Sequence, residues 1–203
     1  IYKEPGKNYL RLETGNCDVH DHRTKRDVFG IPRLLTGHFA LHPKGKIING
    51  TMHLDLWNAE ASTDITTTKG VIHLRSFVHA DEMMIIVKAT TEGDEHDFQW
   101  EWIAAEANSP RYLIFKRQGK TNKIPKDYEL NPTAKISNGK EINLSVQKLL
   151  AGGETSVGWQ ETYNPETERN LWINLTHTAS HIITLEICKA EIRKAIRKGY
   201  QSM

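Results

Sequence analysis

Apolar and polar residues alternate along much of this chain. Between residues 52 and 57 the even positions hold Met or Leu, and the odd positions hold His, Asp and Trp. Residues 71–79 alternate in the same way, and Phe98, Trp100 and Trp102 share one face of a further segment. A period of two sends successive side chains to opposite faces of an extended chain. These segments therefore predict β-strands, several of them with one buried face.

Short turn signals separate the predicted strands. Lys69-Gly70 stands between two strand-like runs and predicts a hairpin, and similar pairs containing Gly or Asn recur along the chain. The uninterrupted apolar run 83–87 predicts a strand that is buried on both faces. No long helical pattern alternates with the strands, which disfavours a doubly wound α/β fold. The chain is thus expected to be all-β, with antiparallel sheets packed as a sandwich.

The periodicity changes near the C-terminus. From about Leu185 to Tyr200, apolar residues recur at nearly every fourth position, and Lys and Arg fill the other faces. This pattern predicts an amphipathic helix after a β-sandwich domain of residues 1–184. Residues 185–203 either cap the sheet or begin a linker toward a missing catalytic domain, and the linker is the favoured interpretation. The polar stretch from Arg117 to Lys140 is expected to be a long loop.

Composition and charge narrow the function only by exclusion. The 203 residues include 27 basic and 25 acidic ones, and the formal net charge of +2 gives no reason to expect nucleic acid or a membrane as partner. No apolar run approaches the roughly 18 residues of a membrane-spanning helix. Since the chain starts at Ile1 without a signal-peptide pattern, we expect its natural start to be missing. A disulfide between Cys17 and Cys188 stays open, although two buried free thiols are favoured.

Metal and nucleophile chemistry find little support in the sequence. Residues 18–23 hold two Asp and two His, and His20 and His22 would point the same way on a strand. A metal would need a further ligand such as His38 or His42, and a polar loop whose Asp residues pair with arginines is favoured. The sequence has no Gly-rich phosphate loop after a strand and no nucleophile elbow. We therefore assign no catalytic residue, no metal and no cofactor.

Tryptophans beside polar side chains point to contact with carbohydrate. Sugar rings stack through their C–H surfaces on the electron-rich faces of aromatic rings. Trp57 lies opposite an apolar strand face and next to Asn58 and Glu60, and Trp172 lies opposite another apolar face. Trp57, Asn58, Glu60 and Trp172 are therefore the expected carbohydrate-contacting residues. The alternative, which we favour, is that both tryptophans are buried between layers of the fold.

A series of motifs in the first part of the chain resembles a known family. The segments that carry the resemblance are, in chain order, Pro32-Arg33-Leu34-Leu35-Thr36-Gly37-His38-Phe39, Gly45-Lys46-Ile47, Leu54-Asp55-Leu56-Trp57-Asn58-Ala59-Glu60-Ala61 and Arg75-Ser76-Phe77-Val78-His79. This series resembles the N-terminal β-sandwich of large bacterial glycoside hydrolases similar to the inverting α-L-fucosidase family. The resemblance is strongest over residues 18–80 and weak over residues 110–150. The family's Gly-Asn-Gly-x-Leu-Gly segment is absent, and only Thr14-Gly15-Asn16 is similar to it.

The resemblance implies both a fold and a role in a larger protein. It implies an antiparallel supersandwich of the galactose-mutarotase type, followed by a helical linker and an (α/α)6 barrel that carries the catalytic carboxylate. This chain would then be a non-catalytic domain that supports the barrel and contributes to the substrate cleft. Its partners would be its own C-terminal catalytic domain and the carbohydrate substrate of the parent enzyme, with no nucleic acid and no membrane. The implied location is the periplasm or the exterior of a bacterium.

Two other functions stay open at this point. An autonomous carbohydrate-binding module would bind glycans through Trp57 or Trp172. A mutarotase-like sugar epimerase would need a His and a carboxylate on one concave sheet, for example His38 or His79 with Glu60 or Glu161. The favoured hypothesis predicts an exposed apolar patch where the barrel docks and a C-terminal helix that leads away from the sheet.

Overall fold

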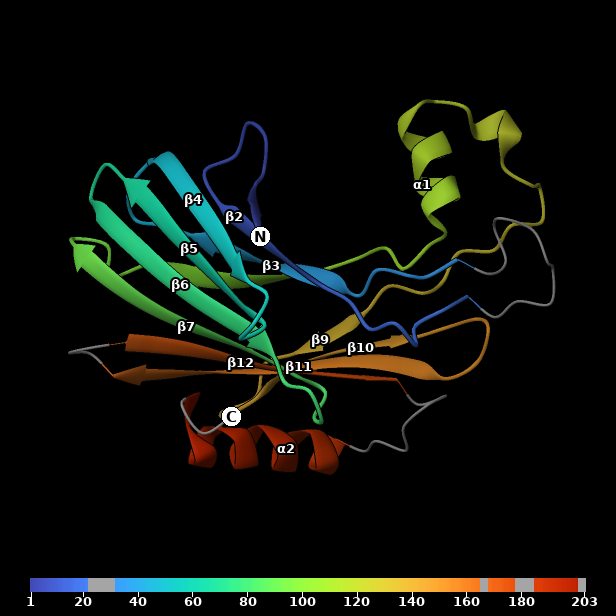
Figure 1. The fold of residues 1–203 in the computed structure, drawn as a ribbon. Coiled ribbons are helices and arrows are strands. Elements are labelled where there is room, and N and C mark those ends of the chain that lie inside the picture. The colour runs from blue at the N-terminus through green and yellow to red at the C-terminus, as the bar shows by residue number, and fades with distance from the viewer. Residues whose placement is uncertain (22–31, 165–167, 178–184, 201–203) are drawn as a thin grey trace.

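The computed structural model describes residues 1–21, 32–164, 168–177 and 185–200. Its smaller sheet has four antiparallel strands (Figure 1). Their order across the sheet is β1 (Tyr2–Lys3), β2 (Leu10–Thr14), β3 (Gly37–His42) and β8 (Gln99–Ala104). Because β1 is only two residues long, this sheet is short at one edge.

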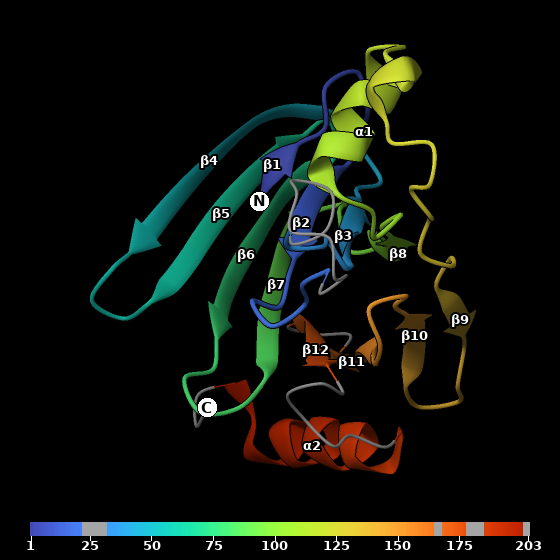
Figure 2. The same cartoon turned by 90° about the vertical axis from the view of Figure 1, so that its right-hand side faces the viewer.

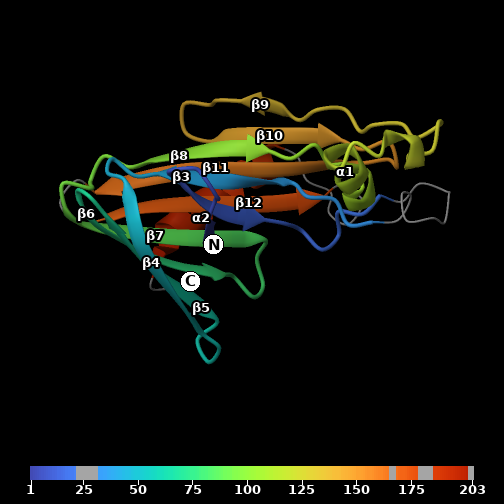
Figure 3. The same ribbon diagram turned by 90° about the horizontal axis from the view of Figure 1, so that it is seen from above.

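The larger sheet has eight antiparallel strands; part of it lies beneath the smaller sheet, and its other end curves up beside the smaller sheet (Figures 1 and 3). Their order is β4 (Ile47–Asp55), β5 (Glu60–Thr67), β6 (Gly70–Val78), β7 (Met84–Gly93), β12 (Glu168–His177), β11 (Glu154–Asn164), β10 (Asn143–Lys148) and β9 (Lys135–Ser137). The hairpin predicted at Lys69-Gly70 is confirmed as the β5–β6 turn. The all-β sandwich expected from the alternating pattern is therefore the observed fold.

An aromatic cluster fills the space between the two sheets. The Phe39 ring lies 4.8 Å from that of Trp102 and 5.6 Å from that of Trp159, so it joins the smaller sheet to the larger one. Phe98 is buried in the same cluster and Trp100 packs against it, which confirms that Phe98, Trp100 and Trp102 share a face. Such large rings contribute much of the apolar area that a sandwich buries.

A third layer covers the outer face of the larger sheet. The helix α2 (Leu185–Lys198) lies against β11 and β12 (Figures 1 and 2). It buries Cys188, Ile192 and Ala195 against a cluster that includes Ile86 and Trp172. The predicted amphipathic helix is confirmed, but the prediction that it leads away from the sheet is wrong. The apolar stripe of α2 faces an apolar sheet face, so docking removes both from water.

Charged and aromatic contacts fix the C-terminal end of α2. Lys194 and Lys198 reach Oε1 of Glu82 at 2.8 and 3.2 Å. The hydrogen bond from Lys194 is the main reason why the pKa of Glu82 is lowered, and Lys198 adds to it. Beyond the helix, the ring of Tyr200 packs edge-on against Phe77 at 5.2 Å. These contacts hold the helix end over β6 and the β6–β7 turn.

The strand β7 has apolar residues on both faces, because one face points into the sandwich and the other is covered by the α2 layer. Val87 belongs to the cluster between the sheets, whereas Ile86 belongs to the cluster beneath α2. The strand predicted from residues 83–87 is therefore buried on both sides, as expected.

The long loop expected from Arg117 to Lys140 contains regular elements. A helix α1 (Pro110–Arg117) ends where the loop was expected to begin, a single 3-10 turn η1 (Thr121–Lys123) follows, and β9 lies inside the predicted loop. Ser109 caps α1 by accepting a hydrogen bond from the Tyr112 N–H. Asn131 ties the segment to the sandwich, since its side chain donates to the Ala107 carbonyl and accepts from the Leu150 N–H.

The two cysteines are free thiols in different environments. Cys17 is exposed and Cys188 is buried on the face of α2 that meets the sheet, so there is no disulfide between them, and the expectation of two buried thiols holds for Cys188 alone. Burial raises the pKa of Cys188 to about 11. The Cys188 thiol therefore behaves as a small apolar group of the core.

Gly158 in β11 lies directly beneath α2. A Cβ atom there would stand 2.4 Å from Sγ of Cys188 and 3.4 Å from Cδ1 of Ile192. Gly158→Ala is expected to lower the free energy of unfolding by about 2 kcal/mol, because a fixed helix leaves no room for the added methyl group. Urea denaturation followed by circular dichroism measures the loss.

The matched control for this prediction is Gly50→Ala in β4. The nearest atom outside its own neighbours would be 3.5 Å from the new Cβ, so stability should hardly change. Adding Cys188→Ala to Gly158→Ala removes the sulfur atom and should restore much of the lost stability. A Gly158→Ala protein as stable as the unmodified one would contradict the placement of α2.

Candidate functional site

The four residues expected to contact carbohydrate do not form one site. Trp57 and Asn58 lie in the β4–β5 turn, Glu60 begins β5, and Trp172 lies in the middle of β12. Trp172 is only 2% exposed, and its indole N–H donates to Oγ1 of Thr162 at 2.9 Å. The favoured alternative, that Trp172 is buried between layers of the fold, is therefore confirmed, and an outward-facing Trp172 is ruled out. Its face of the sheet is covered by α2, a layer that alternation within one strand does not reveal.

Glu60 is engaged in holding the fold together. Its carboxylate accepts hydrogen bonds from Nε of Arg75 at 2.6 Å and from the hydroxyl of Tyr200 at 3.0 Å. Burial and then the hydrogen bond to Glu60 raise the pKa of Tyr200. The carboxylate of Glu60 thus links β5, β6 and the end of α2, and its oxygens already have protein partners.

The β4–β5 turn is held in one conformation by Asp55. Its carboxylate accepts the backbone N–H groups of Trp57 at 2.9 Å and Asn58 at 3.1 Å, and also the side-chain amide of Asn58 at 2.7 Å. The amide of Asn58, followed by these backbone groups, lowers the pKa of Asp55. Ala59 completes the turn with a positive φ of 52°. The turn is therefore ordered even though its apolar side chains face solvent.

An apolar surface runs from β4 to this turn. We call Met52, Leu54, Leu56 and Trp57 the hairpin strip. Met52 and Leu54 are more than half exposed, while Leu56 is 83% and Trp57 is 94% exposed. Soluble proteins scatter single apolar residues over their surface, but four large neighbours on one hairpin form a patch of the kind that binds a partner.

The exposure of the hairpin strip follows from the unequal size of the two sheets. Met52 and Leu54 pair with Thr63 and Ala61, so they lie on the face of the larger sheet that is directed toward the smaller one. Figure 2 shows the β4–β5 hairpin reaching past the smaller sheet. The prediction that Met52, Leu54 and Leu56 share an apolar side is correct for Met52 and Leu54, which lie in β4. In the described part of the chain, however, no second layer covers this side.

Three of the four residues considered for a mutarotase-like site, Glu60, Glu161 and His79, are engaged in other contacts. His38 is buried, and its pKa is lowered by desolvation and then by Arg11. Glu161 pairs with Arg169 at 2.9 Å, and Nδ1 of His79 accepts the N–H groups that follow it in the β6–β7 turn. The structure therefore gives no support to an acid–base pair made from these residues.

Metal-ligating side chains do not gather in the described ranges. No group of three or more His, Cys, Asp or Glu residues that could hold an ion is found there. His20 lies within those ranges, whereas His22 of the proposed pair lies outside them. No pattern in the sequence predicts the exposed pairs of His42 with Glu101 at 2.8 Å and His73 with Asp64 at 2.7 Å. Each pair joins neighbouring strands that only the folded register brings together.

Two comparisons with known proteins found no match. No protein-family model matches the chain, and no curated protein matches it significantly. Among the helices of the described residues, none is long and apolar enough to cross a membrane. The class of protein defined by fold and surface is thus a β-sandwich domain with an ordered, apolar hairpin.

Proposed function

We propose that this chain is the non-catalytic sandwich domain of a glycoside hydrolase, and that its hairpin strip docks against the catalytic barrel of the parent enzyme. The hydrolase and its (α/α)6 barrel rest on the motif resemblance in residues 18–80. The docking role rests on one observation, the exposure of four large apolar side chains on an ordered hairpin.

The energetics of the hairpin strip support a docking role. Complete burial of one large apolar side chain contributes about 1.5–3 kcal/mol, so covering the strip would stabilise an interface by several kcal/mol. The turn is already fixed by Asp55, and little conformational entropy is lost when Leu56 and Trp57 are covered. In this proposal Trp57, at the tip of the hairpin, is the residue that borders the substrate cleft. The parent enzyme would act in the periplasm or outside the cell.

One observation favours a second function, an autonomous carbohydrate-binding module. The ring of Trp57 is almost fully exposed and could stack on a sugar. Binding modules add hydrogen bonds to such a ring, yet the amide of Asn58 is bonded to Asp55 and Glu60 is bonded to Arg75 and Tyr200. Docking to another domain needs no polar partner at the tip, and it is therefore the better-supported function.

Substitutions at the tip separate these two functions. In the complete gene product, Trp57→Ala and Leu56→Ala are each expected to lower the melting temperature of the catalytic domain and to leave the fold of the sandwich intact. In the 203-residue chain, neither should alter stability, and glycans at millimolar concentration should not bind. Tyr163→Ala, at an exposed aromatic residue outside the hairpin strip, is the control.

Two results would contradict the docking function. One is a reading frame that stops at Met203, which leaves no barrel to dock. The other is glycan binding by the 203-residue chain that Trp57→Ala abolishes, since this would assign Trp57 to a binding module.

A further inference from the structure

Two Asn-Gly dipeptides occur in this chain, and the fold places them in different environments. Asn49-Gly50 lies in β4, whereas Asn138-Gly139 lies in the turn between β9 and β10. Both dipeptides are typical of turns, but only the second one lies in a turn. All four residues are exposed to solvent. The chain therefore presents the same reactive dipeptide in two backbone conformations.

An Asn-Gly dipeptide can modify itself without an enzyme. The backbone nitrogen of the glycine loses its proton and attacks Cγ of the asparagine. A C–N bond forms, the side-chain nitrogen leaves as ammonia, and the product is a five-membered succinimide ring. Water then opens the ring at either carbonyl and yields aspartate or isoaspartate. Glycine favours this attack because it has no side chain to hinder the approach or to restrict its backbone.

The β9–β10 turn leaves both reacting groups of Asn138-Gly139 available. Within the described residues, neither the Asn138 side chain nor the Gly139 N–H has a hydrogen-bond partner. The ladder between the two strands ends at the pair of Ser137 with Leu144, so it does not hold the dipeptide. A Cβ atom at position 139 would overlap the carbonyl oxygen of Ile142. The fold therefore requires the glycine that makes this dipeptide reactive.

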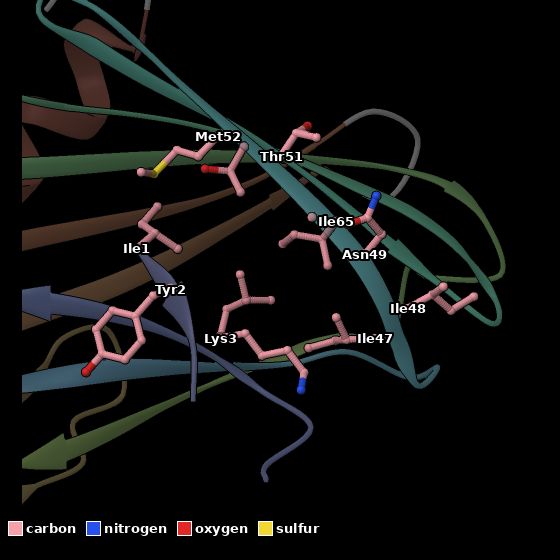
Figure 4. Close-up of a pocket in the computed structure, with 12 residues that line it drawn as sticks. Ile1, Tyr2, Lys3, Ile47, Ile48, Asn49, Thr51, Met52 and Ile65 are labelled. Atoms are coloured by element: carbon pink, nitrogen blue, oxygen red, sulfur yellow. The ribbon is translucent and has the colours of Figure 1, made fainter. Parts of the chain in front are cut away.

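The β4–β5 ladder protects the other dipeptide. Asn49 pairs with Thr66, and Gly50 pairs with Ile65. Figure 4 shows Asn49 within the β4 strand. Ring closure bonds the Gly50 nitrogen to Cγ of Asn49 and turns the peptide plane, which is incompatible with the extended backbone of the ladder. The strand must first open locally, and this opening costs free energy.

Positive charges lie beside the reactive turn. A pocket of about 240 Å³ between the turn and α2 is lined by Gly139 and by three cationic side chains, those of Lys140, Lys189 and Arg193 (Figure 2). Its lining also contributes the carboxylate of Glu141, which Arg193 contacts at 2.6 Å. Loss of the Gly139 proton and attack on Cγ create negative charge, first on nitrogen and then on the amide oxygen. Nearby cations stabilise such charge and favour the reaction.

We propose that Asn138 is a site of spontaneous modification, at which deamidation converts the neutral amide in the β9–β10 turn to an aspartate or isoaspartate carboxylate. The new negative charge lies two residues before Lys140. Isoaspartate also routes the main chain through the side chain, which lengthens the turn and loosens β9, a strand of three residues at the edge of the larger sheet. This inference is independent of the docking function.

Peptide mapping of the aged 203-residue chain tests the inference. The folded protein is incubated at mildly alkaline pH, where the glycine N–H loses its proton more readily, and samples are digested at acidic pH to stop further conversion. Mass spectrometry detects the exchange of the amide nitrogen for oxygen. Asn138 is expected to convert at least about tenfold faster than Asn49, because Asn49 reacts only from the locally opened strand. The ammonia released should match the conversion of Asn138.

Three controls separate the chemistry of the turn from other effects. Asn138→Gln keeps an amide but would have to form a larger ring, so it should stop modification of the turn without changing the circular dichroism spectrum. Unfolding the chain in urea removes the ladder, and the two dipeptides should then react at similar rates. Lys189→Ala removes one cation from the pocket and should slow conversion of Asn138 several-fold while Asn49 is unaffected.

Three outcomes would overturn the inference. The first is a folded chain in which Asn138 stays intact, and the second is conversion of Asn49 at the same rate as Asn138. The third is a rate difference that persists in urea, since the fold would then not be its cause. An unchanged rate in Lys189→Ala would overturn the role assigned to the cations. None of these results alters the test of the docking function, which uses the complete gene product.

Discussion

Ile192→Asp is expected to detach α2 from the larger sheet and to lower the free energy of unfolding by about 4 kcal/mol. Ile192 is completely buried between α2 and the sheet, next to Cys188 and Ala195. A carboxylate at this position would lose its hydration, and no cation lies in this apolar cluster to compensate it. Chemical denaturation measures the effect, and exposure of Trp172 to solvent would report the loss of the helix.

The control for this prediction lies on the same helix. Ile187 is exposed in the first turn of α2, so Ile187→Asp should change stability by less than about 0.5 kcal/mol. An acidic side chain near a helix N-terminus is also favourable. If the two variants were equally stable, α2 would be a linker that leaves the sheet rather than its third layer.

Glu95→Ala is expected to lower the free energy of unfolding by about 3 kcal/mol. Glu95 is completely buried, and its carboxylate accepts the backbone N–H groups of Gly45 at 2.8 Å and Lys44 at 3.0 Å as well as the hydroxyl of Thr67. Removing the carboxylate would take the acceptor from the buried Gly45 N–H and the part-buried Lys44 N–H, and would leave the Thr67 hydroxyl with the Gly70 carbonyl as its remaining acceptor. The loss should appear as a lower midpoint of urea unfolding with an unchanged slope.

Glu92→Ala provides the matched comparison. Glu92 is an exposed residue at the end of β7, three positions from Glu95, and its removal should be nearly neutral. Glu95→Gln keeps one acceptor oxygen and should be intermediate between Glu95→Ala and the unmodified protein. If Glu95→Ala were as stable as Glu92→Ala, Glu95 would not join the β3–β4 turn to the larger sheet.

The sequence correctly predicted the elements whose residue pattern depends on a single strand, hairpin or helix. The β5–β6 hairpin, the strand of Phe98, Trp100 and Trp102, and the helix α2 all carry local periodicity or turn chemistry that survives folding. The position of Ser109 before Pro110 is also a local cap signal, and it would have identified α1 just before the predicted polar region.

The sequence was a poor guide where a residue's environment depends on another layer. Trp172 lies on the face of β12 that a solvated sheet would expose, but α2 returns from the C-terminus to cover it. Met52 and Leu54 have the alternation of core residues, yet the smaller sheet stops before reaching them. Their environments depend on the width of each sheet and on helix docking, which are properties of the whole chain.

The candidate site was therefore only partly predictable. Trp57 and Asn58 were identified from the sequence, and they lie together at the exposed tip. The apolar surface predicted for barrel docking has a counterpart in the hairpin strip, whereas the role assigned to it remains a proposal.

Hydroxyl-radical footprinting of the hairpin strip tests the central proposal most directly. It compares the oxidation rates of Met52, Leu54, Leu56 and Trp57 in the 203-residue chain and in the complete gene product, with exposed Tyr163 as the internal reference. If the strip docks against another domain, its four side chains should oxidise several-fold more slowly in the complete product, while Tyr163 reacts equally in both. Equal oxidation of the strip in the two proteins would contradict the docking function.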